Sequence, residues 1–316
     1  MTTDHLLELH NLTKRFGRLT AVDDMSFAVT RGEVLGFLGP NGSGKSTTMR
    51  MVTGYLPPTS GTAVVCGFDV TRDPIEVKRR IGYLPEGAPL YGDMTPQELL
   101  DFVARLRGYA GADKAKRIGT AVERLMLEEV RHRPIDNLSK GFKRRVGIAQ
   151  AILHDPEVLI LDEPTDGLDP NQKHEVRGLL NELAGEKAIV ISTHILEEIE
   201  ALCTRAIVIT RGRLVADETP EALLARSAYD GAVRVQINLQ QFDDTMSALK
   251  GAQLTLVAAS TLNGRSHVVV RGSNGDDRDV EAMVTNVLAD SNITAEHVQL
   301  ERGRLDDVFR NLTAED

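Results

Sequence analysis

The fold of this 316-residue chain is decided by residues 34–47, which read VLGFLGPNGSGKST. The run Val34–Leu38 is apolar without interruption, which is typical of a β-strand buried on both faces of a sheet. The residues that follow fit the pattern G-x-x-x-x-G-K-[ST], and we predict a helix from about Lys45 to Val52. Glycines in such a turn let backbone N–H groups point inward, so the strand, loop and helix together indicate a phosphate-binding site.

The side chains of this loop indicate that the phosphates belong to a nucleotide. The N-terminus of the helix contributes partial positive charge. Lys45 is expected to contact the β- and γ-phosphates, and Ser46 to offer its hydroxyl to Mg²⁺. The residues expected to contact the nucleotide here are Gly39, Pro40, Asn41, Gly42, Ser43, Gly44, Lys45, Ser46 and Thr47. The alternative is a chance glycine-rich turn, which the strand before it and the helix after it disfavour.

Two carboxylates end the aliphatic run Val158–Leu161. Open α/β sheets bind their ligands in the crevice beyond the carboxyl ends of the strands, so Asp162 and Glu163 are expected to lie there. Asp162 would hold Mg²⁺ through water, and Glu163 would accept the proton of the attacking water as a general base. A surface acidic pair at the start of a loop is the alternative, and the presence of a phosphate loop disfavours it.

A third motif, LSKGF at residues 138–142, lies between the other two. In this order and spacing the motifs resemble those of the ATP-binding subunits of ABC transporters, and the resemblance covers about residues 6–218. The usual family signature is L-S-G-G-Q, so the lysine and the phenylalanine depart from it. The resemblance implies that Ser139 and Gly141 complete the γ-phosphate site of an opposing subunit. The local alternative is a helix cap followed by a solvated basic face.

Three further residues match functional positions of the family. Phe16 matches an aromatic residue that stacks on adenine, with a core aromatic as the alternative. Asp169 matches an acid in the loop through which the two subunits sense each other. His194 follows the apolar run Ile189–Ser192 and matches a histidine that contacts the γ-phosphate and orients the catalytic carboxylate. A purely structural histidine is the alternative at that position.

The sequence departs from the family at Glu86, where a glutamine is usual. The resemblance implies that this residue contacts Mg²⁺ and faces the permease. A carboxylate also ligates Mg²⁺, but it adds a charge and lacks the amide donor. The following segment Gly87–Tyr91 is apolar for a surface loop, so we predict a docking surface for a membrane partner. An ordinary packed turn is the alternative.

We predict an α/β fold with a P-loop NTPase core, an inserted helical subdomain and a small C-terminal α+β (ferredoxin-like) domain. The ATP-binding domain is expected at residues 1–220, with the helical subdomain at about 87–153, and the accessory domain at 228–316. The predicted strands are Leu6–His10, Ser26–Val29, Glu33–Leu38, Thr62–Val65, Val158–Asp162, Ala188–Thr193, Val233–Leu239, Leu254–Ala258, His267–Val270 and Ile293–Leu300. Further helices are predicted from Thr95 onward and at Ala121–Leu127, Phe142–Leu153, Lys173–Leu183, Asp243–Leu249, Asp277–Leu288 and Leu305–Leu312.

The composition is that of an ordinary globular chain, with 41% hydrophobic and 26% charged residues. A net charge of −9 disfavours nucleic acid as a partner, because nucleic-acid binding relies on basic side chains. Cys66 and Cys203 are expected to be buried thiols in a reducing compartment. No apolar run approaches the ~18 residues of a membrane span, and Met1–His5 does not resemble a signal peptide. We therefore expect a cytoplasmic protein that is peripheral on the cytoplasmic face of the membrane.

The resemblance implies an ATPase of which two subunits, identical or paralogous, close head-to-tail on two MgATP and power a separate integral membrane permease. The signature, Glu86 and the C-terminal segment Leu305–Phe309 resemble the subfamily paired with ABC-2-type permeases, which implies export. One alternative is a non-transport ABC ATPase that acts on ribosomes or DNA. Another is a small-molecule kinase, which would have no use for the motif at 138–142. The C-terminal domain either regulates and contacts subunits or serves as a stabilising cap.

Overall fold

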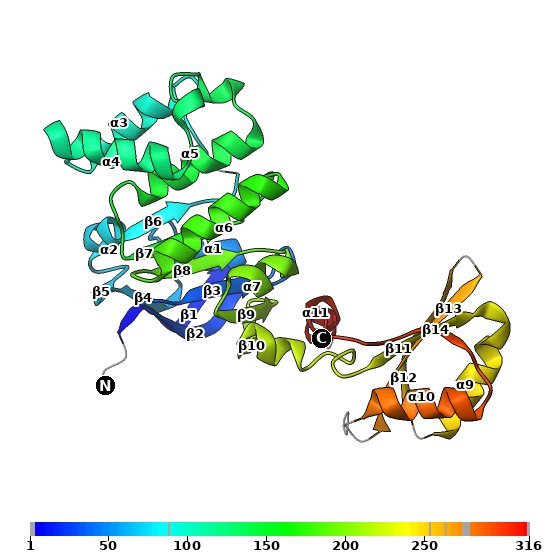
Figure 1. Cartoon of the computed structure of the whole chain (residues 1–316). Coiled ribbons are helices and arrows are strands. Elements are labelled where there is room, and N and C mark those ends of the chain that lie inside the picture. Colours follow the sequence, from blue (N-terminus) through cyan, green and yellow to red (C-terminus); the bar gives the residue numbers. More distant parts are fainter. Residues whose placement is uncertain (1–3, 88, 253, 263, 274–278, 315–316) are drawn as a thin grey trace. The chain divides into compact units, whose positions relative to one another are not determined.

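The computed structural model describes residues 4–87, 89–252, 254–262, 264–273 and 279–314 (Figure 1). The chain divides into two compact units, Met1–Pro220 and Glu221–Asp316. Each unit has its own hydrophobic core. Every residue that the sequence predicts for the nucleotide site belongs to the first unit.

A six-stranded sheet lies at the centre of the first unit (Figure 1). Its strand order is β10 (Arg213–Glu218), β9 (Arg205–Thr210), β3 (Val34–Leu38), β8 (Ala188–Ser192), β7 (Val158–Asp162) and β6 (Ile81–Leu84). All neighbours are parallel except β9 and β10. Every residue of β3, β7 and β8 is buried, as their uninterrupted apolar runs predict. Because these three strands are parallel neighbours, their carboxyl ends meet at one edge of the sheet.

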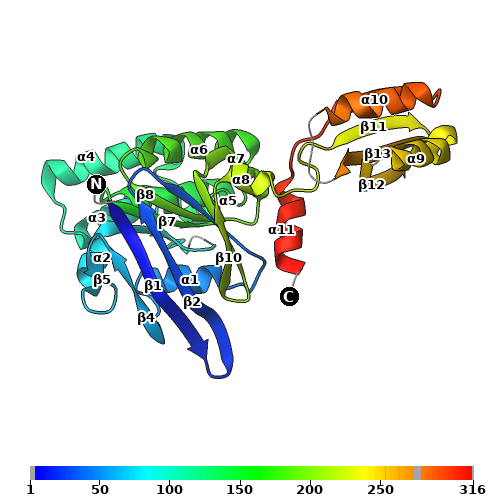
Figure 2. The ribbon, with the colours of Figure 1, turned by 90° about the horizontal axis from the view of Figure 1, so that it is seen from below.

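The second sheet of this unit is antiparallel, in the order β2 (Leu19–Thr30), β1 (His5–Phe16), β4 (Ser60–Val65) and β5 (Phe68–Asp69). Figure 2 shows β1 and β2 as the long blue hairpin beside β4. Both strands extend well beyond the predicted Leu6–His10 and Ser26–Val29. Their pairing shifts register four times, and such bulges interrupt the alternation of apolar and polar residues on which the prediction depends.

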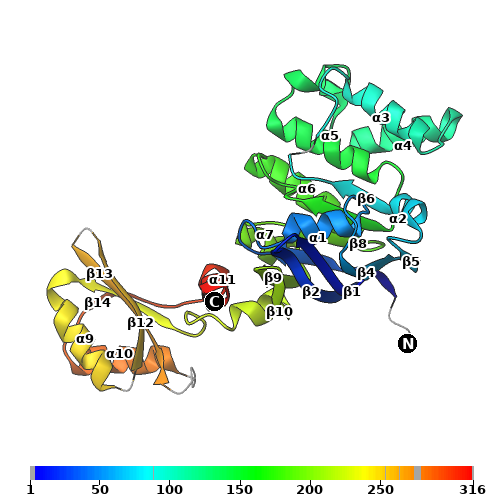
Figure 3. The ribbon, with the colours of Figure 1, turned by 180° about the vertical axis from the view of Figure 1, so that it is seen from behind.

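Several helices of the first unit follow the sequence pattern. Helix α1 (Lys45–Val52) has the predicted bounds, and α3 (Pro96–Leu106) starts with the predicted capping box between Thr95 and Glu98. The prediction for α4 (Gly111–Arg124) was wrong at both ends, because its first two turns are largely polar and Leu125–Leu127 lies outside the helix. The remaining helices are α2 (Pro74–Arg80), α5 (Lys140–Ile152), α6 (Pro170–Ala184), α7 (Leu196–Leu202) and, at the unit boundary, α8 (Pro220–Leu224). Helices α3, α4 and α5 group together next to α6 and β6 (Figures 1 and 3).

The second unit has the element order β-α-β-β-α-β followed by a last helix. The elements are β11 (Val233–Asn238), α9 (Phe242–Gly251), β12 (Leu254–Leu262), β13 (Arg265–Gly272), α10 (Val280–Asp290), β14 (Ala295–Leu300) and α11 (Leu305–Ala314). The sheet order is β12-β13-β11-β14, and all pairs are antiparallel. Side chains of α9 and α10, among them Leu249 and Val284, pack on Val233 and Val235 of β11. The predicted start of α10 at residues 277–278 lies outside the described residues.

Candidate nucleotide-binding site

The loop between β3 and α1 requires glycine at two positions because the backbone approaches closely there. A Cβ on Gly39 would lie 2.5 Å from the carbonyl oxygen of Ile209. A Cβ on Gly44, whose φ is +107°, would lie 2.5 Å from the carbonyl oxygen of Ala21. The hydroxyl of Ser43 is buried in the loop without a hydrogen-bond partner among the described residues. A loop of this shape with an unsatisfied donor inside it fits the oxygen atoms of a phosphate.

Lys45 occupies the centre of this loop with only 8% of its surface exposed. Its ammonium group donates hydrogen bonds to the carbonyl oxygens of Gly39 at 2.6 Å and Pro40 at 3.2 Å. Burial lowers the pKa of Lys45, and nearby carboxylates oppose that change, namely those of Glu163, Asp162 and Glu86. The cation is therefore held among backbone carbonyls and acids, where the phosphates of a nucleotide would supply a stronger partner.

A cavity of about 350 Å³ joins the loop to residues from three other segments. Its lining consists of Ala21, Asn41, Gly42, Gly44, Lys45, Ser46, Thr47, Glu86, Asp162 and Glu163. Asp162 ends β7, Glu163 follows it, and Glu86 lies in the loop after β6, so the structure brings together the phosphate loop, the acid pair and Glu86. A volume of this size lies at the small end of the range for small-molecule sites.

The end of β8 holds the acid pair in place, and the sequence reading missed this contribution. Ser192 pairs in register with Asp162, and its hydroxyl donates a hydrogen bond to Asp162 Oδ1. The backbone N–H of Glu163 donates to the carbonyl oxygen of Ser192 at 3.0 Å and to its hydroxyl at 3.2 Å. Glu163 has φ of +51°, a left-handed conformation that is uncommon outside glycine. The register of β7 and β8 thus places both carboxylates at the sheet edge.

His194 lies at the predicted position beside the acid pair. Its Nδ1 atom is 2.8 Å from Oε1 of Glu163. The imidazole is mostly exposed, whereas the carboxylate is largely covered. His194 is therefore in contact with the predicted base from the loop that follows β8, and its ring also faces solvent, where a second group can reach it.

Ser139 and Gly141 lie at the start of α5 and do not line the cavity. Ser139 is the N-cap residue, and its hydroxyl accepts a hydrogen bond from the N–H of Phe142 at 3.3 Å. Gly141 packs against the side chain of Gln172, which belongs to the capping box that Asp169 forms at the start of α6. Both signature residues thus stand at the N-terminus of α5, outside the nucleotide cavity of their own chain; Ser139 is exposed there and Gly141 is buried.

Phe16 and the loop after Glu86 both present aromatic rings to solvent. Phe16 ends β1 with 49% of its surface exposed, which contradicts the core-aromatic alternative. Lys14 Nζ lies 5.2 Å from the centre of its ring. Tyr91 is 57% exposed and makes an edge-on contact with Phe102 of α3, with ring centres 6.0 Å apart. Residue 88 of this loop lies outside the described residues.

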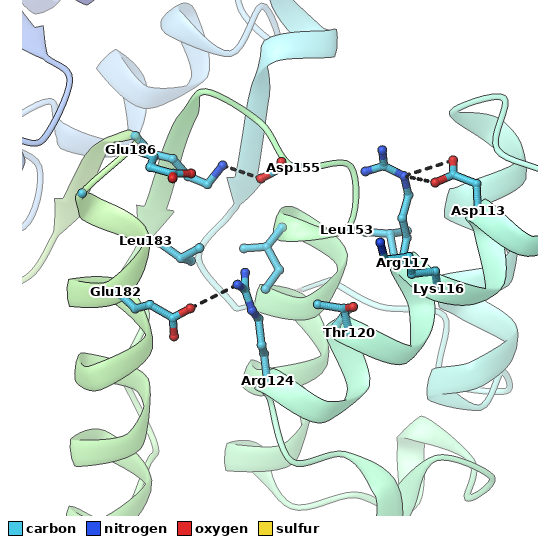
Figure 4. Close-up of a pocket in the computed structure, with 14 residues that line it drawn as sticks. Asp113, Lys116, Arg117, Thr120, Arg124, Leu153, Asp155, Glu182, Leu183 and Glu186 are labelled. Carbon is cyan, nitrogen blue, oxygen red and sulfur yellow. Dashed lines mark hydrogen bonds and ion pairs between the residues drawn. The ribbon is translucent and has the colours of Figure 1, made fainter.

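A larger cavity of about 650 Å³ lies away from these motifs, between α4, the end of α5 and the end of α6 (Figure 4). Six of the eight charged side chains in its lining form ion pairs with one another. The ion pairs are Arg117 with Asp113 at 3.2 Å, Arg124 with Glu182 at 3.1 Å and Lys187 with Asp155 at 2.5 Å. The lining contains as many acidic as basic side chains, so this cavity is a polar, charge-balanced gap between the helices.

The phosphate loop, the paired acids and the histidine meet at one sheet edge and form a candidate nucleotide-binding site. The family model described as "ABC transporter" matches residues 22–166. The chain is 39% identical over 227 residues to the probable multidrug ABC transporter ATP-binding protein YbhF of Escherichia coli, covering 71% of this chain and 39% of that one. It therefore spans less than half of the length of that relative.

Two other relatives are matched over most of their length. The chain is 37% identical to the Nod factor export ATP-binding protein I of Ralstonia nicotianae, covering 78% of this chain and 75% of that one. It is 32% identical over 316 residues to the linearmycin resistance ATP-binding protein LnrL of Bacillus subtilis, covering 98% of both. This second match includes the C-terminal unit.

Solved structures agree with the sequence relatives. The structure titled "ATP binding subunit of ABC transporter" has a TM-score of 0.65 and 32% identity, covering 69% of this chain and 91% of that one. The dimeric cassette MJ0796 has a TM-score of 0.62 and 26% identity, covering 68% of this chain and 98% of that one. The chain belongs to the family of ABC transporter ATP-binding proteins. Among the described residues, no helix combines the length and apolar character that crossing a bilayer requires.

Proposed function

We propose that this chain hydrolyses MgATP between two subunits that close head-to-tail, and that the cycle powers a separate integral membrane permease that exports its substrate. The observation that carries the proposal is the incomplete site. Lys45, Ser46 and Glu163 line the nucleotide cavity, whereas Ser139 stands at a helix N-terminus outside it. The relative MJ0796 is described as dimeric, and one of its structures as bound to ADP and Pi.

The residues of the cavity divide the chemistry among themselves. Backbone N–H groups of residues 39–47 would bind the phosphates, with Lys45 as the cation. Glu163 would take the proton of the attacking water, and His194 would hold that carboxylate in position through the contact at 2.8 Å. Phe16 would stack on the adenine, since its ring is half exposed at the end of β1.

Ser46, Asp162 and Glu86 would hold Mg²⁺. No group of three His, Cys, Asp or Glu side chains among the described residues is arranged to hold a metal ion alone. This fits Mg²⁺, which is usually bound through one or two carboxylates together with substrate phosphates. When bound, the ion would neutralise charge on the phosphates.

Substitution of Glu163 by Gln tests the chemical step. The shape of the side chain and its contact with His194 are kept, while the proton acceptor is lost, so ATP binding stays and hydrolysis stops. The assay is phosphate release by the purified chain, with Glu200→Gln, an exposed residue of α7, as the matched control. Hydrolysis by Glu163→Gln at the wild-type rate would remove Glu163 from the role of base.

Substitution of Ser139 by Arg tests the shared site. Because Ser139 lies outside the cavity of its own chain, Ser139→Arg should leave nucleotide binding in place and abolish hydrolysis. Hydrolysis per chain should also fall on dilution, as subunits separate. A lone subunit that hydrolyses ATP at full rate and tolerates Ser139→Arg would contradict head-to-tail closure.

The loop Glu86–Tyr91, together with α3, is the proposed contact with the permease. Tyr91 and Phe102 form an exposed aromatic pair, and Leu106 of the same helix is 77% exposed. Apolar side chains gathered on a surface in this way favour a protein partner. Export is supported by relatives whose names include multidrug transport, Nod factor export and linearmycin resistance. In this role the chain would lie at the cytoplasmic face of the membrane, and an ABC-2-type permease should co-purify with it. If the permease no longer co-purifies with the Tyr91→Ala variant, the loop and α3 are the contact surface.

The second unit is proposed to be a ferredoxin-like accessory domain at residues 228–316. The support is its β-α-β-β-α-β order and the antiparallel sheet β12-β13-β11-β14. A chain that ends near Ala228 tests its role. Changed permease assembly or changed regulation of hydrolysis indicates a contact or regulatory domain, and unchanged behaviour indicates a stabilising cap.

A further inference from the structure

Glu198 is a buried carboxylate that the chemistry described so far does not use. It lies in the first turn of α7 with 2% of its surface exposed. Both of its oxygen atoms accept hydrogen bonds from threonine hydroxyls. Thr193 Oγ1 donates to Oε2 at 2.8 Å, and Thr165 Oγ1 donates to Oε1. Each threonine is itself 1% exposed, so the three side chains form one buried cluster.

The two threonines belong to the two loops that carry the reactive groups. Thr165 follows Glu163 by two residues in the loop after β7, and Thr193 immediately precedes His194 in the loop after β8. The same loops also meet at the surface of the site, where His194 Nδ1 lies 2.8 Å from Glu163 Oε1. Glu198 is therefore a second link between the loops after β7 and β8, and unlike the contact of His194 with Glu163 it is buried.

The chemistry of this cluster argues against a role in stability alone. Burial of a carboxylate costs several kcal/mol before its hydrogen bonds are counted, and apolar side chains of similar volume often stabilise a core at least as well. What a carboxylate supplies and an apolar side chain does not is a pair of acceptors with fixed spacing. Here those acceptors hold the hydroxyls of Thr165 and Thr193 at a set distance from each other.

The link also extends toward the face that would meet the opposing subunit. Asp166 is the residue after Thr165. Its carboxylate Oδ2 forms ion pairs with Nζ of Lys140 in the signature, at 3.6 Å, and with the guanidinium of Arg144, at 3.9 Å. The same segment continues to Asp169, which caps α6. A displacement of this segment would thus be transmitted through Thr165 and Glu198 to the residue that precedes His194.

We propose that Glu198 is a positioning residue for hydrolysis: by bridging Thr165 and Thr193 it sets the spacing of the loops after β7 and β8, so that His194 holds Glu163 in place. The inference rests on the proposed ATPase function. Glu198 contacts neither the cavity lining nor the phosphate loop in any described interaction. Its loss should therefore affect turnover much more than nucleotide affinity.

The test compares Glu198→Ala with Glu198→Gln in the full chain, measuring kcat and KM for ATP together with Kd for fluorescent MANT-ATP. Misplacement of catalytic groups by about 1 Å costs up to about a hundredfold in rate, so kcat of Glu198→Ala should fall about ten- to a hundredfold. Kd should change less than about twofold, as expected when an interaction acts in the transition state alone. Glu198→Gln should recover most of kcat, because its amide reaches both threonines, accepting from one and donating to the other. Glu197→Ala and Glu200→Ala, both exposed on the same helix, are the matched controls.

Coupling to His194 distinguishes positioning from general stability. In a His194→Ala background, Glu198→Ala should lower kcat by less than about twofold, because residues that act as a unit are not additive. If Glu198→Ala does not fold, Thr165→Val, which removes the hydrogen bond to Glu198 alone, should lower kcat in the same way. Thr193→Val should do so too, although it also removes the bond that Thr193 Oγ1 accepts from the N–H of Ile195 at 3.0 Å. Unchanged kcat in folded variants would overturn the inference about Glu198 but not the proposed function. Fully additive effects of Glu198→Ala and His194→Ala on kcat would do the same. A wild-type chain without ATPase activity would overturn the proposed function and this inference with it.

Discussion

His154 makes the first unit sensitive to acid in a way that can be calculated from its surroundings. The residue follows α5 and is 7% exposed, and its Nε2 lies 3.0 Å from the carbonyl oxygen of Ile81 at the start of β6. Since a carbonyl only accepts, Nε2 carries the proton, and the buried Nδ1 has no hydrogen-bond partner among the described residues. Burial, followed by the positive charge of Arg107, lowers the pKa of His154 to about 4, although the bond to Ile81 opposes the shift.

The sign and size of the effect follow from the two pKa values. The unfolded chain takes up this proton near pH 6.5 and the folded chain only near pH 4, so stability falls as the pH drops between these values. Above pH 6.5 the ring is neutral in both states, and below pH 4 it is charged in both. A difference of about 2.5 pKa units corresponds to about 3 kcal/mol of unfolding free energy.

Urea unfolding at pH 7 and at pH 4 measures this loss when wild type is compared with His154→Gln. The chain has no tryptophan, so circular dichroism is the appropriate signal. The glutamine keeps a donor toward Ile81 but does not titrate. The unfolding free energy of His154→Gln should therefore fall about 3 kcal/mol less than that of wild type between pH 7 and pH 4. Carboxylates contribute equally to both proteins, and His174→Gln, an exposed site on α6, is the control. Equal pH dependence of wild type and His154→Gln would refute the reasoning.

Three further predictions concern the nucleotide site. Gly44→Ala should weaken nucleotide binding far more than Gly42→Ala. Both glycines have positive φ, but only a Cβ on Gly44 would lie 2.5 Å from a carbonyl oxygen, that of Ala21. Equal Kd values for the two variants would contradict this expectation. Phe16→Ala should raise KM for ATP about tenfold through loss of stacking worth about 1–3 kcal/mol, with little change in thermal unfolding, and an unchanged KM would exclude the stack. Removal of Mg²⁺ with EDTA should abolish phosphate release, and hydrolysis without a divalent cation would show that the carboxylates of the cavity do not serve a metal.

The parts of the molecule that depend on local sequence were predicted well. The buried strand β7 and the helix α1 have their predicted bounds, because uninterrupted apolar runs and a glycine-rich start leave few alternatives. The capping box at Thr95 is likewise a signal contained within four residues. By contrast, α2 and β10 were not predicted. Both elements are short; α2 is mostly exposed, and β10 has only six residues, so neither carries a clear hydrophobic periodicity.

The parts of the site that depend on pairing between distant strands were not accessible from the sequence. Ser192 contacts Asp162 only because β7 and β8 are parallel neighbours in one particular register. The link from Thr165 through Glu198 to Thr193 has the same origin, since it joins residues of two successive loops. Sequence motifs thus predicted the groups that would contact the nucleotide, while the groups that hold those residues in place became visible only when the order of the strands was known.

The charges of the cavity give the departure at Glu86 a physical meaning. Glu86, Asp162 and Glu163 line the cavity with Lys45 as the cation beside them, so the lining carries more negative than positive charge. A nucleoside triphosphate adds further negative charge, and like charges repel one another. A glutamine at position 86 would reduce that repulsion. With the glutamate, binding of the nucleotide and binding of a divalent cation must be strongly coupled, so the dependence of ATP affinity on Mg²⁺ should be steeper in this chain than in its Glu86→Gln variant.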